Sequence, residues 1–295
     1  MDIEKEKEWS GKTDGMPWMQ RSLIFMFKHI NIRILYAVMA VVVMFYMVFN
    51  HKGYIAMYRF FRKRFCFSPV KAFFNVYMNH YKFGQIILDR FAFYAGKRFD
   101  MTTVGNDNFS NLMKGEDGFI MLSSHVGNYE LCGYHLKADT KKIYALVFAG
   151  ETETVMKNRS KMFEGHNINM IPVLSDMSHL FAVNNALSDG NVVSMPGDRV
   201  FGSQKSISCK FFGESAKFPY GPFATAVQRE LPMLPVFVMK ESCKSYRIYV
   251  HKIDYPQEGK RAEKAAFMAQ EFASLLETTL KSYPTQWFNY YDFWS

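Results

Sequence analysis

The sequence predicts an α/β protein with a mainly parallel mixed sheet flanked by helices, preceded by an N-terminal membrane-associated helix. Two patterns support this prediction. From about residue 118 onward, short apolar runs typical of strands alternate with longer helical stretches, an order that favours parallel strands covered on both faces. Near the N-terminus, residues 34–49 are apolar without interruption, which is typical of a helix that meets a bilayer.

The overall composition favours a lipid-facing protein. The chain has 295 residues and a formal net charge of +9, which suits polyanionic partners such as phospholipid headgroups, an acidic carrier protein or nucleic acid. It also contains 29 Phe, 17 Tyr and 20 Met residues. A polar nucleic-acid surface does not need so much apolar area, and no recognised nucleic-acid motif is present. We therefore expect a phospholipid membrane and no nucleic acid as partner.

The apolar stretch 34–49 predicts the membrane attachment. As a helix its sixteen residues extend roughly 24 Å, less than the ~30 Å hydrocarbon core. A single span, a helix lying in the interface and a buried soluble helix all remain open. Basic residues are more numerous after the stretch than before it, which predicts that the body of the protein lies on the cytoplasmic side of the membrane. These basic residues alternate with aromatic ones and suit anionic headgroups: Lys52, Arg59, Arg62, Lys63 and Arg64.

The remaining elements follow from apolar runs and turn signals. We expect residues 1–66 to form a tail and the membrane-anchoring helix, and residues 67–295 to form one catalytic domain. One or two helices are predicted over 69–97. Strands are predicted at 119–124, 143–148, 168–173, 191–195, 207–212, 234–239 and 245–252. Helices are predicted at 128–137, 152–165, 176–188, 221–230 and 260–282.

Several chemistries have no support in the sequence. The four cysteines, Cys66, Cys132, Cys209 and Cys243, are far apart, so we expect reduced thiols and no metal site. The chain has no G-x-x-x-x-G-K-[ST], no G-x-S-x-G and no H-E-x-x-H sequence, and we expect no cofactor.

The candidate catalytic residue is His125. It follows the apolar run 119–122 and therefore lies at the carboxyl end of a predicted strand, where open α/β sheets place their ligands. Gly127 allows the chain to fold back and bring Glu130 beside the imidazole. A carboxylate on one ring nitrogen fixes the tautomer and raises the basicity of the other. The alternative is a surface histidine followed by an ordinary first-turn glutamate.

A second candidate is Asp198-Arg199, which follows the predicted strand 191–195. The planar guanidinium of Arg199 suits a phosphate or a developing oxyanion, with Asp198 holding it in position. The alternative is a surface turn in which Asp198 caps the local backbone.

Four segments resemble one enzyme family. His125-Val-Gly-Asn-Tyr-Glu130 resembles the H-x4-D/E signature of the lysophospholipid acyltransferase superfamily, in the form found in the bacterial lipid A late acyltransferases (lauroyl and myristoyl transferases). Residues 195–199, 211–222 and 284–294 are similar to further segments of that family, in the same order. The chain departs from the pattern at Tyr129, where Trp is commoner, and in its opening, Trp9 to Trp18.

This resemblance implies an acyltransferase that moves a fatty acyl group from an acyl thioester to a hydroxyl of a membrane lipid. The implied donor is acyl carrier protein, with coenzyme A possible, and the implied acceptor is similar to a lipid A precursor. His125 is the implied general base and Glu130 orients it. The implied substrate-binding residues are Gly127, Asn128, Asp198 and Arg199.

Three alternatives remain open beside that activity. The unusual opening favours an acceptor simpler than lipid A, such as an aminoacyl or polyene lipid. A membrane lipid hydrolase would use the same pair of residues to activate water. A non-catalytic lipid-binding protein would not need His125.

Overall fold

The structure is a computed structural model that describes residues 22, 25–27, 29–49, 51–136, 140–148, 167–174, 178–200 and 205–294. The predicted helix over 152–165 and the opening from Trp9 to Trp18 lie outside the described residues.

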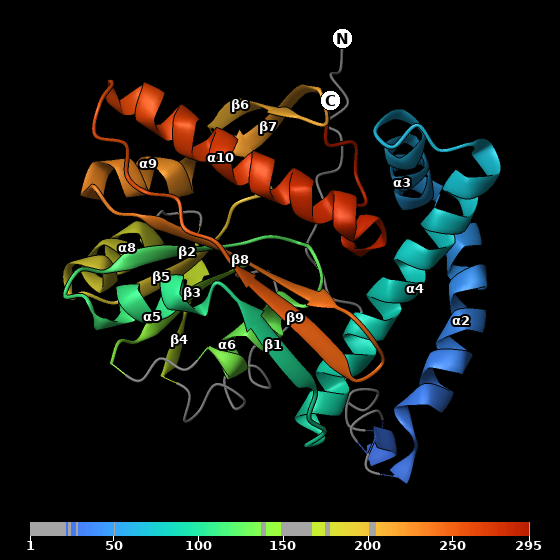
Figure 1. The fold of residues 1–295 in the computed structure, drawn as a ribbon. Coiled ribbons are helices and arrows are strands. Elements are labelled where there is room, and N and C mark those ends of the chain that lie inside the picture. Colours follow the sequence, from blue (N-terminus) through green and yellow to red (C-terminus); the bar gives the residue numbers. More distant parts are fainter. Residues whose placement is uncertain are drawn as a thin grey trace.

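A seven-stranded sheet forms the centre of the molecule, with the order β1-β9-β8-β2-β5-β3-β4 (Figure 1). All neighbouring strands are parallel except β8 and β9, which confirms the predicted mainly parallel mixed sheet. The strands are β1 (Asp100–Val104), β2 (Phe119–Ser123), β3 (Ile143–Phe148), β4 (Ile168–Val173), β5 (Val192–Pro196), β8 (Met233–Lys240) and β9 (Ser245–Val250).

Helices cover both faces of this sheet because its central strands are apolar on both sides. In β2, Phe119 and Met121 belong to one buried cluster and Ile120 and Leu122 to another, as the two-residue period of a strand requires. The first cluster includes side chains of α5 (Asn106–Lys114) and α6 (Cys132–His135). The second includes side chains of α8 (His179–Ser188), α9 (Tyr220–Arg229) and α10 (Arg261–Ser282).

One predicted strand belongs to a separate hairpin. Antiparallel strands β6 (Ser206–Phe211) and β7 (Glu214–Pro219) pair only with each other in the described structure. Figure 1 shows this hairpin beside α10. Phe212 and Gly213 form the turn between the two strands, both with positive φ.

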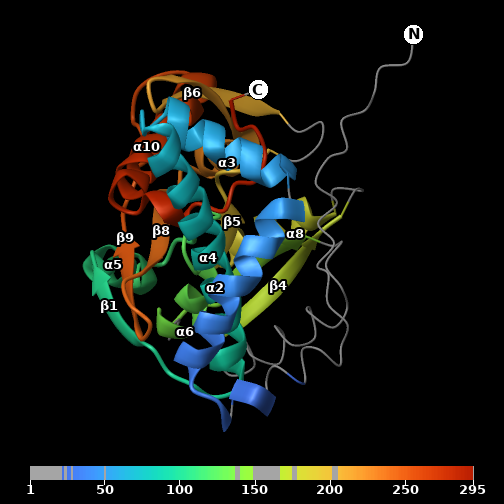
Figure 2. The ribbon, with the colours of Figure 1, turned by 90° about the vertical axis from the view of Figure 1, so that its right-hand side faces the viewer.

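The N-terminal helices pack against the end of the sheet domain. Residues predicted as one or two helices form a single helix, α4 (Pro69–Tyr94), and α2 (Ile32–Phe49) runs beside it (Figure 2). The fit is close at Gly84, where a Cβ atom would lie 2.7 Å from the Met39 side chain. One face of α2 is therefore buried against α4, while the other face is exposed at Ile34, Val38, Val41, Val42, Phe45, Val48 and Phe49.

The basic and aromatic stretch after α2 forms α3 (His51–Lys63). Its basic side chains are mostly exposed, as expected for a face that meets headgroups. Three of its apolar side chains, Met57, Phe60 and Phe61, are instead buried in the larger core cluster. The amphipathic pattern of α3 therefore serves core packing on one side and a basic surface on the other.

Candidate active site

The register of two parallel strands brings the two candidate sites together. Strands β2 and β5 are neighbours, and Ser123 at the end of β2 pairs with Pro196 at the end of β5. His125 and Asp198 each lie two residues beyond the end of their strand. Parallel strands end at the same edge of a sheet, so the two predicted sites form one site.

His125 and Asp198 are joined by two hydrogen bonds. The imidazole Nδ1 lies 2.8 Å from Asp198 Oδ1, and the His125 backbone N–H donates to Asp198 Oδ2 at 2.8 Å. The Trp287 indole N–H is directed at the same Oδ2 at 3.5 Å. The Asp198 side chain is 1% exposed and that of His125 is 22% exposed, so the carboxylate is enclosed while the imidazole remains accessible.

Burial and the charges around this pair favour a neutral His125 imidazole and an ionised Asp198 carboxylate. Burial and the nearby Arg199 charge lower the pKa of His125, and Asp198 offsets them only in part. Burial acts to raise the pKa of Asp198, but His125 and Arg199 outweigh it and the pKa is lowered. Because an ionised carboxylate only accepts hydrogen bonds, Nδ1 carries the proton and Nε2 has the free lone pair.

Glu130 lies in a different environment from the one predicted. The carboxylate that accepts from His125 Nδ1 is Asp198, whereas Glu130 Oε2 pairs with Arg90 Nε of α4 at 2.8 Å. The Tyr94 hydroxyl also donates to Glu130, at 3.4 Å. In place of a helix beginning at residue 128, the chain forms a short 3-10 turn, η1 (Tyr129–Leu131), followed by α6. This turn directs Glu130 toward α4.

Gly127 and Asn128 fix the loop that presents His125. The Gly127 N–H donates to Gln286 O at 2.9 Å, and the Asn128 N–H donates to Val238 O at 2.8 Å. Gly127 has φ +51°, and a Cβ atom there would lie 1.9 Å from Val238 O. Glycine is therefore required at this position on two grounds, the backbone conformation and the close approach. Both backbone N–H groups are already bonded to the protein.

The C-terminal segment forms a wall of the site, a role that its sequence similarity alone does not specify. Residues 286–288 run antiparallel to the His125 loop, with a bridge between Val126 and Trp287. The Phe288 N–H donates to His125 O at 2.9 Å. Arg199 is held by the same segment, because its Nη2 donates to Phe288 O at 2.7 Å. The segment thus positions both His125 and Arg199.

Trp287, Phe288 and Arg90 are site residues that sequence reasoning did not single out. Trp287 is 1% exposed and closes the site behind Asp198. The conspicuous Pro-Thr-Gln-Trp-Phe-Asn-Tyr-Tyr run was a usable signal for the first two, since such a dense aromatic segment packs against something specific. Arg90 offers no such signal within a helix of 26 residues.

The histidine–carboxylate pair lies at the carboxyl ends of parallel strands, where open α/β enzymes bind their ligands. The family model of the bacterial lipid A biosynthesis acyltransferases matches residues 90–294, and the chain belongs to this family. The protein is thus an acyltransferase that acts on lipid. A search of curated proteins finds no match.

Proposed function

We propose that the protein transfers a fatty acyl group from an acyl carrier protein thioester to a hydroxyl of a lipid A precursor-like membrane lipid. His125 is the general base, and Asp198 orients it. The observation that supports these roles is the bond from Nδ1 to a buried carboxylate, because it directs the Nε2 lone pair toward a substrate. The family supports the lipid acceptor.

The reaction needs no covalent acyl-enzyme because the thioester is already activated. Nε2 of His125 takes the proton of the acceptor hydroxyl while its oxygen attacks the thioester carbonyl. The tetrahedral oxyanion then collapses, the carbon–sulfur bond breaks, and the thiolate takes the proton back from the imidazolium. The products are a lipid ester and the free thiol of the carrier. Arg199 supplies positive charge beside the oxyanion.

Glu130 has a supporting role in this mechanism. Its ion pair with Arg90 fastens the loop after His125 to α4, so it positions the base through the backbone. Gly127 and Asn128 act in the same way through their bonds to Gln286 and Val238. The family resemblance implies a substrate-binding role for Asp198. In our proposal Asp198 instead orients the His125 imidazole.

The lipid extract of a deletion strain tests the proposed function. We expect mass spectrometry to show a lipid A species lighter by one acyl chain than that of the parent strain. Unchanged lipid A with an acyl chain lost from another lipid would move the acceptor to a simpler lipid. With purified protein, labelled donor that yields free fatty acid equally with and without acceptor would indicate a hydrolase and contradict acyl transfer.

The pH dependence of kcat/KM follows from the shifted pKa of His125. Its pKa is lowered from 6.5, so the imidazole is neutral and active at pH 7 and becomes protonated only in more acidic solution. We expect kcat/KM to be level near neutral pH and to fall on the acid side with an inflection below 6.5. An inflection above this value would mean that Asp198 dominates over burial and Arg199.

The same proposal places the protein at the cytoplasmic face of the inner membrane, with residues 1–66 as the anchor and residues 67–295 as the acyltransferase domain. α2 has the length and composition of a membrane span, with a mean hydropathy of 2.3 and 22% of the segment buried. Further apolar side chains are exposed at the start of α4, at Val70, Phe73 and Phe74. Together these side chains form a surface that suits the bilayer.

Substituting the exposed face tests the attachment without removing the packed face of α2. Val38→Lys/Val42→Lys places two charges near the middle of α2, on side chains that are 55% and 48% exposed. Each lysine costs on the order of 2.5–3.5 kcal/mol at the centre of a bilayer, so we expect the protein to leave the membrane fraction. Phe267→Lys, at a 53% exposed side chain of α10, is the control and should stay bound. Equal membrane binding of both variants would refute the attachment.

A further inference from the structure

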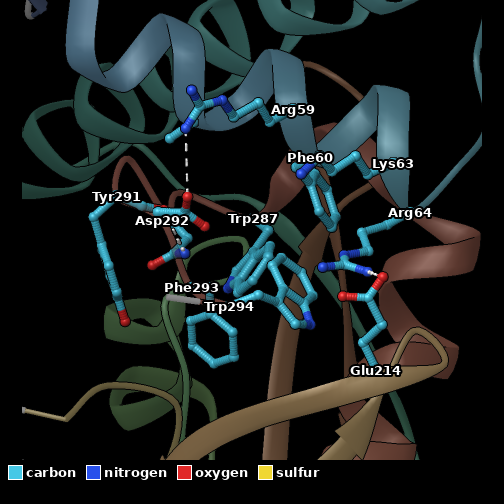
Figure 3. A pocket seen from close by; sticks show the side chains of 12 residues that line it. Arg59, Phe60, Lys63, Arg64, Glu214, Trp287, Tyr291, Asp292, Phe293 and Trp294 are labelled. Atoms are coloured by element: carbon cyan, nitrogen blue, oxygen red, sulfur yellow. Dashed lines mark hydrogen bonds and ion pairs between the residues drawn. The ribbon is translucent and has the colours of Figure 1, made fainter.

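A pocket lies between α3 and the C-terminal segment, behind the catalytic pair. It has a volume of about 130 Å³. Figure 3 shows basic side chains of α3 on one side and, on the other, the aromatic side chains of Trp287, Tyr291, Phe293 and Trp294. Glu214 of β7 lies at its edge. The mechanism above does not use this pocket.

Three cations line the pocket, and α3 contains no acidic residue. Arg59 faces Asp292 at 3.5 Å, with both side chains more than half exposed. Arg64 is paired with Glu214 at 2.5 Å and stacks on the Trp294 ring at 4.2 Å. Lys63 is exposed and has no ion-pair partner among the described residues. Positive charge therefore exceeds negative charge by one in the lining.

A buried polar atom in the same pocket also lacks a partner. Asn289 is 3% exposed, and its Oδ1 has no hydrogen-bond partner within the described part of the chain. Its Nδ2 donates to Tyr291 O at 3.4 Å. Because this oxygen is enclosed by the protein, a ligand in the pocket does not reach it in this structure. The surplus cation of the lining therefore decides the class of ligand, and it favours a phosphate ester.

Two aromatic side chains join the pocket to the catalytic site. Trp287 lines the pocket and directs its indole N–H at Asp198. Tyr291 also lines it, and the Arg199 guanidinium lies 6.0 Å from the centre of the Tyr291 ring. The pocket is also lined by α3, which follows the membrane helix α2 directly in the chain. A lipid held in the bilayer beside α2 would thus bring its headgroup to this pocket.

We propose that this pocket binds the phosphate-bearing headgroup of the acceptor lipid, with Lys63 and Arg59 contacting the phosphate. The assignment of this headgroup to the acceptor lipid rests on the proposed function, whereas phosphate binding in the pocket does not. Because Arg59 and Asp292 are exposed and loosely paired, the guanidinium can turn to a phosphate at little cost.

Direct binding tests the site independently of catalysis. The probe is dihexanoyl phosphatidic acid, added to the full chain in detergent and followed by the change in tryptophan fluorescence, to which Trp287 and Trp294 of the pocket contribute. Dihexanoylglycerol, which has the same chains and no phosphate, is the reference probe. We expect saturable binding of the phosphatidic acid alone. Arg59→Ala/Lys63→Ala should weaken it by about tenfold or more, because two charge-assisted contacts are lost.

Lys52→Ala is the matched control, because Lys52 is an exposed cation of the same helix that does not line the pocket. Its loss changes the general attraction to anionic lipid as much as Lys63→Ala does. We expect Lys52→Ala to bind the probe as the wild type does. Equal weakening by Lys52→Ala and Lys63→Ala, or equal binding of dihexanoylglycerol, would overturn the site.

Kinetics identify which substrate brings the phosphate. In the transfer assay, Lys63→Ala should raise KM for the acceptor lipid and leave KM for the acyl donor unchanged. A rise in the donor's KM instead would contradict the proposal. His125→Ala should bind phosphatidic acid as the wild type does. Phosphatidic acid binding in a protein that transfers no acyl group would refute the proposed function and leave the phosphate site intact.

Discussion

His125→Ala should lower the turnover of acyl transfer by on the order of 10²–10⁴-fold, the usual contribution of a general base. The His125 imidazole is accessible, whereas the Asp198 carboxylate bonded to it is buried. Alanine at position 125 removes the Nε2 atom that would accept the proton. The measurement is the formation of labelled lipid product from labelled donor at saturating concentrations of both substrates. The effect should appear in kcat, because the proton moves only as the hydroxyl attacks.

His135→Ala provides the control for this prediction. His135 is exposed in α6, and its Nε2 lies 3.1 Å from the Thr103 hydroxyl, so its loss should leave turnover near the wild-type value. Near-normal turnover in folded His125→Ala protein would contradict the mechanism, whatever the control shows.

Lys240→Met should lower the free energy of unfolding by about 3–5 kcal/mol, the cost of leaving one charge of a buried pair without its partner. Lys240 of β8 is paired with Asp89 of α4, with side chains 1% and 0% exposed. The hydroxyls of Tyr36 in α2 and Tyr246 in β9 also donate to Asp89. Burial raises the pKa of Asp89 and lowers that of Lys240, while their pairing opposes both shifts.

This buried cluster joins α2 to the loop that carries His125. Asn128 Nδ2 donates to the Tyr246 hydroxyl at 3.4 Å, and the backbone of Lys240 exchanges two hydrogen bonds of 2.9 Å with the Gln286 side chain. The unfolding of Lys240→Met should therefore be followed with chemical denaturant in detergent. Any loss of activity in this variant should accompany its loss of stability.

A surface pair gives the control for Lys240→Met. Lys252→Ala removes the partner of Asp254, a pair in which Asp254 is 77% exposed. Such exposed pairs contribute about 0–1 kcal/mol. The double variant Asp89→Asn/Lys240→Met should recover much of the lost stability, because it removes both charges and keeps an acceptor for the two tyrosine hydroxyls. Equal small losses for Lys240→Met and Lys252→Ala would show that the buried pair is not a structural requirement.

The sequence was sufficient to place each half of the site at a strand end but not to join the halves. His125 and Asp198 were both predicted to follow strands, and both do. Their contact depends on β2 and β5 being neighbours with Ser123 opposite Pro196. Strand order results from packing over the whole domain, and no local pattern encodes it. The local H-x4-E spacing therefore pointed to Glu130 as the partner of the imidazole.

Long apolar and long helical segments were the best predicted elements. Strand β8, predicted at 234–239, is buried along its full length, and the predicted helix 260–282 agrees with α10. Strand β1 was missed because Asp100–Val104 is polar and alternates between exposed and half-exposed residues at the edge of the sheet. Helix α5 was missed for a similar reason, since only Phe109 and Met113 are buried in it.

The most direct test of the central claim compares the two carboxylates that compete for the orienting role. Single-turnover acyl transfer should be measured for Asp198→Asn and Glu130→Gln, each checked for folding. Asp198→Asn removes the ionised acceptor of the Nδ1 proton, and the wrong tautomer should cost on the order of 10²–10⁴-fold. Glu130→Gln keeps an acceptor for Arg90 and should remain far more active. A larger loss for Glu130→Gln than for Asp198→Asn would contradict the account.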